Sequence, residues 1–440
     1  MKIERYQAYK KCDIEWLLEI PEHWKIDRAK SLFREMSRPV SPRDKIITVF
    51  RDGQVTLREN RRVTGFTNAI EEYGYQGIRK GDLVFHAMDA FAGAIGVSDS
   101  DGKATPEYLV YTTIDKNKIY VPFFGFLLRQ MALSGFVLAL GKSVRERSPR
   151  FKHTKFVTLD LPIPPFTEQE TIAHYLDTKT AQIDRKIDLL TQKATLYGNL
   201  KQSLINETVT CGLDKSVPMR DSGIEWIGEV PEHWDIKRLK DLSDIQNSNV
   251  DKKSHDDEIP IKLCNYVDVY KNEFINTSLD FMDATANKSE IKQFTIKEGD
   301  VFITKDSETC DDIAIPALAA ESIKGVIYGY HLARLRTKEK VFLGSYLFRL
   351  FQSKSYGFRF VISAKGITRV GLGQSAIADS LTPVPLLSEQ KAIADYLDTK
   401  TAQIDQIIQT INTQIEKLKE LRKTLINDVV TGKIRVIDYQ

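Results

Sequence analysis

The sequence lacks the features that define several large classes of protein. Its four cysteines, Cys12, Cys211, Cys264 and Cys310, are scattered and form no Cys-x-x-Cys pair, which argues against a disulfide framework and a zinc site. No apolar run approaches the roughly 20 residues that cross a bilayer. The N-terminus, MKIERYQAYKKCDIEW, carries charges where a secretion signal needs an apolar segment. We therefore expect a cytoplasmic protein with no membrane partner.

An excess of charge of one sign is also missing. The 440 residues include 63 Lys and Arg and 60 Asp and Glu, for a net charge of +3. Any affinity for nucleic acid must therefore come from local patches. Hydrophobic residues make up 42% and charged residues 28%, as in ordinary globular proteins. The chain is too long for one core, and we expect two to four domains of roughly 100 to 200 residues.

Two segments of the sequence occur twice. IEWLLEIPEHW at Ile14–Trp24 returns as IEWIGEVPEHW at Ile224–Trp234, and YLDTKTAQID at Tyr175–Asp184 returns unchanged at Tyr396–Asp405. The stretches between the repeats differ. The chain is therefore a tandem duplication in which each unit begins with the Pro-Glu-His-Trp element, continues through a divergent middle and closes with a nearly identical segment.

The closing segments have the apolar spacing of long helices. Apolar residues recur at intervals of three, four and seven residues, in the same phase in both copies. This spacing predicts two helices that pack against each other as a coiled coil. The alternative is that each helix packs only on its own domain. Glycines at 212 and 432 are expected to end the helices. The predicted seam consists of Ile172, Leu176, Ile183, Ile187, Leu190, Leu204, Ile393, Leu397, Ile404, Ile408, Ile411, Ile415, Leu418 and Leu425.

The divergent middles predict two α+β domains with largely antiparallel sheets. Short β-rich runs such as GDLVFHA and GDVFITK alternate with turn residues, and each middle holds one apolar helical stretch, PFFGFLLRQMALSGF or LGSYLFRLFQS. We expect a first α+β domain at 1–165, a central helix at 166–212, a second α+β domain at 213–386 and a C-terminal helix at 387–440.

A basic segment follows the apolar helical stretch in both copies. Lys and Arg residues on Gly-rich loops can contact phosphates, and Arg beside Ser, Thr or Gln can contact base edges. A solvated charged face is the alternative. The candidate DNA-binding residues are Lys142, Ser143, Arg145, Arg147, Arg150 and Lys152 in the first copy, and Arg349, Lys354, Arg359, Lys365, Thr368 and Arg369 in the second.

No catalytic, cofactor or metal site is expected in this chain. GFVLALGKS has bulky side chains where a phosphate-binding loop needs bare backbone amides. DAFAGAIG only faintly resembles the glycine-rich turn of methyltransferases, and IPPF lacks the Asn or Asp that amino-methyltransferases place before Pro-Pro. His23 and His233 have no partner at the spacing of an active site, so we interpret them as structural residues beside the repeated tryptophans.

At this level the chain resembles the specificity subunits of type I restriction-modification systems. The resemblance rests on IPPFTEQETIAHYLDTKTAQID, VPLLSEQKAIADYLDTKTAQID, the two IEW…PEHW openings and GDVFITKDSETCDDIAIPALA, and it covers nearly the whole chain. It implies two target-recognition domains that each read one half of a split double-stranded DNA site. It also implies two antiparallel spacer helices that separate these domains.

The same resemblance implies partners for the chain. Two modification subunits would supply adenine methylation and the S-adenosylmethionine site, and restriction subunits would supply ATP-driven translocation and cleavage. Identical helices would then suit two like docking surfaces, and divergent domains would suit two different half-sites. Two alternatives stay open: a divergent DNA methyltransferase that acts on its own, and a scaffold that does not bind DNA.

Overall fold

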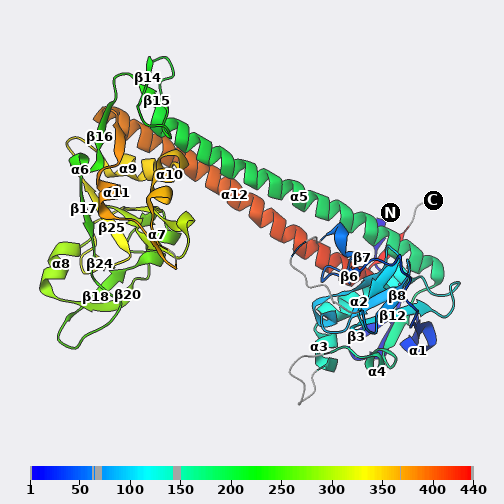
Figure 1. The fold of residues 1–440 in the computed structure, drawn as a ribbon. Coiled ribbons are helices and arrows are strands. Elements are labelled where there is room, and N and C mark those ends of the chain that lie inside the picture. The colour runs from blue at the N-terminus through cyan, green and yellow to red at the C-terminus, as the bar shows by residue number, and fades with distance from the viewer. Residues whose placement is uncertain (1, 62–63, 65–71, 142–149, 367, 438–440) are drawn as a thin grey trace. The chain divides into compact units, whose positions relative to one another are not determined.

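The protein folds into two units, each built on a β-sheet domain and parts of both long helices (Figure 1). This computed structural model describes residues 2–61, 64, 72–141, 150–366 and 368–437. Unit 1 comprises 1–190 and 413–440, and unit 2 comprises 191–412. The expected α+β class is confirmed, whereas the expected domain limits stay a prediction.

Unit 1 is organised around a four-stranded antiparallel sheet. The strand order is β10 (Ile95–Val97), β9 (Leu83–His86), β12 (Tyr108–Thr113) and β5 (Phe33–Glu35). Helix α2 (Val121–Leu133) packs on it and corresponds to the apolar stretch that predicted a helix. The remaining elements are α1 (Ala29–Leu32), α3 (Phe136–Gly141), α4 (His153–Phe156) and the pairs β1 (Lys2–Glu4) with β28 (Arg435–Ile437), β2 (Tyr9–Ile14) with β3 (Leu17–Pro21), β4 (Lys25–Arg28) with β13 (Asp160–Ile163), β6 (Ile47–Val49) with β7 (Val55–Leu57), and β8 (Gln76–Ile78) with β11 (Gly102–Ala104).

Unit 2 contains two larger sheets. The first has the order β17 (Ser243–Asn247), β25 (Leu332–Thr337), β21 (Val301–Thr304), β23 (Pro316–Ala319) and β19 (Phe274–Ile275), and the second has β20 (Met282–Ala286), β18 (Ile259–Cys264) and β24 (Val326–Tyr328). The pairs β18–β24 and β19–β23 are parallel and the others in these sheets are antiparallel. The remaining elements are α6 (Leu239–Leu242), α7 (Tyr266–Lys271), α8 (Lys288–Phe294), α9 (Gly344–Gln352), α10 (Lys354–Ser363), α11 (Gln374–Ala378) and the pairs β14 (Met219–Asp221) with β15 (Glu229–Pro231), β16 (Asp235–Arg238) with β27 (Leu381–Val384), and β22 (Asp306–Ser307) with β26 (Val370–Gly371).

The central strands β9 and β21 are buried on both faces. In β21, Val301 and Ile303 pack in the core that contains α9, whereas Phe302 points into the core of the second sheet. In β9, Phe85 joins the core beneath α2 and Val84 joins a separate small core. Because successive strand residues point to opposite faces, continuous apolar runs are needed at these two places.

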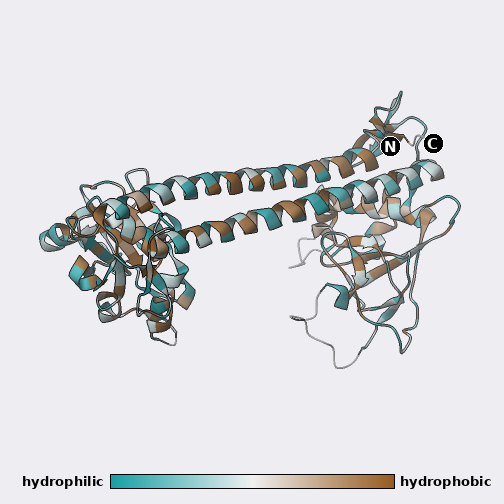
Figure 2. Cartoon of the chain, turned by 90° about the horizontal axis from the view of Figure 1, so that it is seen from above, coloured by the Kyte–Doolittle hydropathy of each residue, from teal (hydrophilic) through white to brown (hydrophobic). Residues whose placement is uncertain are grey.

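Helices α5 (Phe166–Cys211) and α12 (Leu387–Val430) are antiparallel and lie beside each other in both units. Asp184 pairs with Arg422 at 2.9 Å in unit 1, and Lys201 pairs with Asp405 at 2.7 Å in unit 2. Apolar positions recur along both helices (Figure 2). None of the fourteen side chains of the predicted seam is exposed, as expected for a coiled coil.

Each unit takes core residues from both helices. The core of unit 1 contains Ile172 of α5 and Val429 of α12, and the core of unit 2 contains Val209 of α5 and Ile393 of α12. The alternative in which each helix packs only on its own domain is therefore wrong. Gly212 adopts a φ of 75°, the left-handed conformation expected of a glycine after a helix. Over the described ranges, no helix is long and apolar enough to cross a membrane.

Candidate nucleic-acid interface

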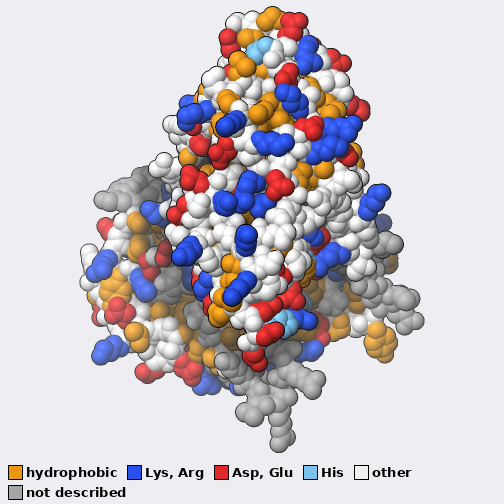
Figure 3. Space-filling view, turned by 90° about the vertical axis from the view of Figure 1, so that its left-hand side faces the viewer, with side chains coloured by type: hydrophobic (Ala, Val, Ile, Leu, Met, Phe, Trp, Pro, Cys, Tyr) orange, Lys and Arg blue, Asp and Glu red, His pale blue; other side chains and the backbone are white. Residues whose placement is uncertain are grey.

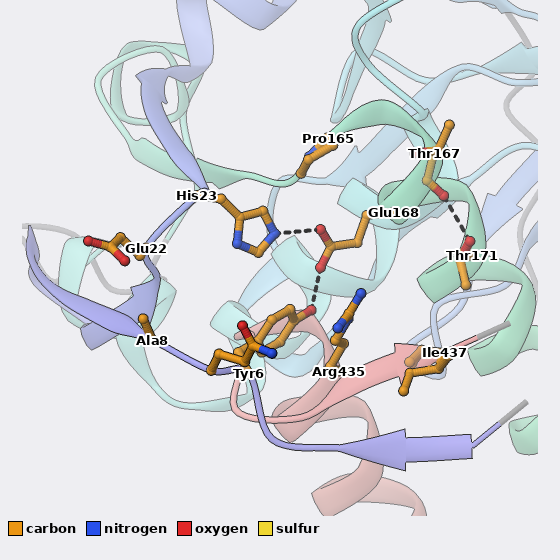
Figure 4. Close-up of a pocket in the computed structure, with 12 residues that line it drawn as sticks. Tyr6, Ala8, Glu22, His23, Pro165, Thr167, Glu168, Thr171, Arg435 and Ile437 are labelled. Carbon is orange, nitrogen blue, oxygen red and sulfur yellow. Dashed lines mark hydrogen bonds and ion pairs between the residues drawn. The ribbon is translucent and has the colours of Figure 1, made fainter.

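The repeated Pro-Glu-His-Trp element binds the first turn of a long helix. In unit 1 the buried Trp24 donates its indole N–H to Glu168 at 3.2 Å, and His23 Nε2 lies 2.8 Å from the same carboxylate. Tyr6 donates its hydroxyl to Glu168 as well, and burial together with this hydrogen bond raises the pKa of Tyr6. Figure 4 shows Tyr6 and His23 pointing toward Glu168. These three residues and Arg435 line a cavity of about 680 Å³.

Unit 2 repeats this arrangement. His233 Nε2 lies 3.0 Å from Glu389, and the indole N–H of Trp234 donates to the same carboxylate at 3.5 Å. In both copies the histidine is paired with the acid that also binds the tryptophan. This pairing supports the structural interpretation of His23 and His233, because the carboxylate binds the Pro-Glu-His-Trp element to the first turn of the long helix.

A second repeated feature lies where the central strand of unit 1 ends. The residue after β9, Ala87, donates its backbone N–H to Glu107 O at 2.9 Å and accepts one from Phe151 at 2.9 Å. Glu107 directly precedes β12, and Phe151 belongs to the segment that returns after the helices α2 and α3. We call this meeting of three segments, Ala87, Glu107 and 150–151, junction 1.

The same three segments meet in unit 2. The residue after β21, Lys305, donates its N–H to His331 O at 3.0 Å and accepts one from Leu372 at 2.7 Å. His331 directly precedes β25, as Glu107 precedes β12. We call this meeting of Lys305, His331 and 369–372 junction 2. The two junctions are topologically equivalent although their sequences differ.

An arginine from the returning segment pairs across junction 1. Arg150 Nη1 lies 3.2 Å from Glu107, and its side chain is 47% exposed. On the neighbouring turn Arg51 binds Asp89 at 2.8 Å, and Asp89 also lies 3.2 Å from His86. Burial lowers the pKa of His86, although Asp89 opposes the effect. Arg150 at junction 1 and Arg51 beside it are therefore exposed guanidinium groups that each pair with a carboxylate.

An arginine also pairs across junction 2. Arg369, 54% exposed at its side chain, places Nη2 3.3 Å from His331 Nε2 and Nε 3.7 Å from Asp306. His331 Nδ1 also pairs with Asp306, and Lys305 lies 2.6 Å from that carboxylate. Burial alone would raise the pKa of Asp306, but the hydrogen bonds from Lys305 and His331 hold it below its ordinary value. Burial lowers the pKa of His331 despite Asp306, so we expect a neutral imidazole near pH 7.

A tight hairpin carries Arg369. Lys365 and Gly371 exchange two backbone hydrogen bonds, at 3.0 and 2.9 Å. Gly366 has a φ of 142°, and a Cβ there would lie 1.9 Å from the carbonyl oxygen of Arg369. Only glycine fits this close approach of backbone to backbone. The hairpin therefore depends on Gly366 to present Arg369.

Two stacked aromatic rings adjoin junction 2. Tyr266 and Tyr270 have ring centroids 5.5 Å apart and nearly parallel planes, and Tyr270 is 42% exposed. The Tyr266 hydroxyl donates to Ser307 at 3.3 Å. Exposed aromatic rings beside cationic groups are common in surfaces that contact nucleic acids.

The structure describes only part of the predicted basic segments. Arg150, Lys152, Lys365, Thr368 and Arg369 are exposed on it. Four further candidates, Lys142, Ser143, Arg145 and Arg147, lie outside the described residues.

Two candidates in the second segment occupy places that do not suit DNA contact. Arg349 is 1% exposed at its side chain and binds Asp398 at 2.6 Å, on α12. Arg359 is partly buried, with its guanidinium carbon 5.4 Å from the ring centre of Trp226. The expectation that Arg349 contacts DNA is therefore wrong, because its side chain is buried. Arg359 is not part of the proposed interface. Lys354 is exposed but begins α10, beside Asn206 of α5.

Sequence reasoning missed the residues that hold the arginines. Glu107 and His331 lie in short turns and Asp306 in the two-residue strand β22, all far along the sequence from the basic segments that they contact. One repeated sequence signal is the Gly-Asp before each central strand, at 81–82 and 299–300. It marks the strands that lead to the junctions but not the residues that hold the arginines. On the face of the molecule in Figure 3, Lys and Arg side chains are interspersed with Asp and Glu.

Part of the chain matches a known family, and several known proteins resemble the chain over a longer stretch. Residues 231–417 match the family described as the type I restriction modification DNA specificity domain. The type I restriction enzyme MjaVIII specificity subunit of Methanocaldococcus jannaschii is 25% identical over 283 residues, which cover 64% of this chain and 63% of that protein. The EcoBI specificity subunit of Escherichia coli is 22% identical, covering 69% of this chain and 64% of its own. The matches thus span somewhat under two thirds of these relatives.

Solved structures share the fold along most of the chain. A chain from a study titled "Structural basis underlying complex assembly and conformational transition of the type I R-M system" superposes with a TM-score of 0.69 at 16% identity, covering 94% of this chain and 99% of that one. The HsdS subunit from Thermoanaerobacter tengcongensis gives a TM-score of 0.54 at 15% identity, covering 94% and 98%. At such identities the likeness concerns the fold.

Proposed function

We propose that the chain is the DNA sequence-specificity subunit of a type I restriction-modification complex, because residues 231–417 match the type I restriction modification DNA specificity domain and the relatives named above are specificity subunits. Its two divergent domains would each read one half of a split double-stranded site. The observation that carries this proposal is the combination of nearly identical helical segments with divergent domains that share an arginine-bearing junction. Identical surfaces suit identical partners, and different domains suit different half-sites.

We further propose that the partners carry the chemistry. Two modification subunits would dock on the like surfaces of α5 and α12 and would hold S-adenosylmethionine, and restriction subunits would hold ATP. The outer faces of the helices support this proposal, because Leu196 and Leu200 of α5 and Leu421 of α12 are 67%, 52% and 54% exposed. Leu196 and Leu200, four residues apart, lie on the same face of α5, and adjoining exposed apolar side chains are a feature of surfaces that contact other proteins. Such a complex would act against foreign DNA.

Binding measurements separate this function from the alternatives. The purified chain with its modification subunits should select a split sequence from duplex DNA, with an affinity that falls steeply as salt rises. Micromolar binding of S-adenosylmethionine to the chain alone would favour a methyltransferase that acts on its own. DNA binding that is absent at low salt would favour a scaffold. Either result would overturn the proposal.

A further inference from the structure

We propose that Arg150 and Arg369 each read a guanine, one in each half-site, and are the specificity-determining arginines of the two units. This inference rests on the proposed function and deepens it. It starts from the equivalence of the junctions: in each unit an arginine of the returning segment pairs with the residue that directly precedes the second central strand, Glu107 or His331. Two units with divergent sequences have kept one arrangement at one topological place.

The state of these guanidinium groups favours base reading over phosphate contact. Each is about half exposed, at 47% and 54%, and each is held by a neighbour, Glu107 or the pair His331 and Asp306. A held guanidinium loses less conformational freedom on binding than a free one. Arginine presents two parallel N–H groups that match O6 and N7 of guanine, and this is the commonest specific contact in the major groove.

The other arginines of the second basic segment are occupied elsewhere. Arg349 is buried against Asp398, and Arg359 lies against Trp226. Lys365, in the same hairpin as Arg369, offers a point charge that suits a phosphate better than a base edge. Within the described residues of that segment, Arg369 is therefore the arginine placed to reach DNA.

The supports of the two arginines differ, which fits two different half-sites. Arg150 faces one carboxylate, and Arg369 faces an imidazole that itself binds a carboxylate. The hairpin closed at Gly366 adds a positioning element to unit 2. Each guanidinium therefore has its own direction and its own neighbours, so the base pairs beside the guanine need not be the same.

The test selects DNA sequences with variants of the assembled complex. The full chain, bound to its modification subunits, is incubated with a pool of random-sequence duplex DNA, and the bound fraction is sequenced. The variants are R150A, R150K, R369A and R369K. The matched controls are R28A and R238A, because Arg28 and Arg238 occupy equivalent strands, are 60% and 56% exposed, and pair with Asp160 and Asp379.

We expect each alanine variant to lose discrimination at one G·C pair of one half-site by about 10- to 100-fold. The other half-site should be unchanged, and R150A and R369A should affect opposite halves. The lysine variants should keep affinity for DNA in general but lose the same discrimination, because lysine cannot pair with two acceptors as arginine does. The control variants should select the wild-type sequence. Melting temperatures of the complexes identify any variant that has lost its fold. If an alanine variant fails to fold, the lysine variant at the same position tests the inference.

Two outcomes would overturn the inference while leaving the proposed function intact. One is that both half-sites survive unchanged in all four variants. The other is equal weakening on every sequence, which would mark the arginines as phosphate contacts. If the wild-type complex selects no sequence at all, the proposed function fails and the inference fails with it.

Discussion

Arg349 shows how a single residue can be misread from sequence. Its place among the Lys and Arg residues of the second basic segment suggested a DNA contact. In the structure it crosses to Asp398, in the repeated YLDTKTAQID segment, and lies 3.5 Å from Glu273. Its partners stand 49 and 76 positions away along the chain, so nothing local in the sequence could reveal them.

Replacing Arg349 with Met should destabilise unit 2. The substitution removes a buried guanidinium and leaves Asp398 and Glu273 without their partner. Because these acids are 47% and 37% exposed, water compensates in part, and we expect a loss of about 1 to 3 kcal/mol in the free energy of unfolding. Urea unfolding followed by circular dichroism measures it. Arg185→Met, which breaks the exposed pair with Asp188 on α5, should cost under about 1 kcal/mol. Equal losses in the two variants would contradict the structural role of Arg349.

Junction 2 should make stability depend on pH. The pKa values of His331 and Asp306 both lie below their ordinary values in the folded protein. The unfolded chain therefore binds more protons than the folded chain as the pH falls, first below the ordinary histidine pKa of 6.5 and later below the ordinary aspartate pKa of 3.8. The contribution of His331 is fully present above pH 6.5 and declines as the pH falls below it.

Urea midpoints measured at about pH 7.5 and about pH 5.5 test this dependence. The wild-type chain should lose stability on acidification, and His331→Asn should lose less, because asparagine takes up no proton. His86, whose pKa burial also lowers, supplies a matched comparison in unit 1, and His86→Asn should have a similar effect there. If His331→Asn loses as much stability as the wild type, His331 is not the group that titrates.

The helices are the elements that the sequence predicts best. Their apolar residues repeat in the same phase in both copies, and a pattern of period near 3.6 specifies which face is buried. The strands around β9, β12, β21 and β25 were also visible as short apolar runs between turns. The junctions were not, because Glu107 and His331 meet the arginines only through strand pairing and returning loops, which involve contacts between distant parts of the chain.

If α5 and α12 set the spacing of the half-sites, their length should change the DNA target. Inserting four residues in α5 near Lys193 adds about one helical turn, or roughly 6 Å. We expect the unread gap to lengthen by about one to two base pairs, at 3.4 Å each, while both half-sites stay the same. Four residues keep the apolar stripe nearly in phase, whereas a two-residue insertion turns it away from α12 and should impair folding. An unchanged gap in an active complex would show that the helices do not set the spacing.

At the scale of the whole molecule, the duplication accounts for both the likeness and the difference of the two halves. The residues that bind each domain to its helix, Trp24 with Glu168 and Trp234 with Glu389, are repeated. The residues at the junctions, Arg150 with Glu107 and Arg369 with His331, keep their place but not their chemistry. Repeated helices would present the same surface to two identical subunits, and divergent domains would present different surfaces to two different half-sites.

Mapping of methylated adenines across the genome of a host that carries this chain and its modification subunits tests the proposed function most directly. We predict methylation confined to one split sequence, with two short specified halves separated by an unread gap of fixed length, and its complete loss when this chain alone is deleted. Methylation that persists without the chain, or that follows a single uninterrupted sequence, would contradict the proposal.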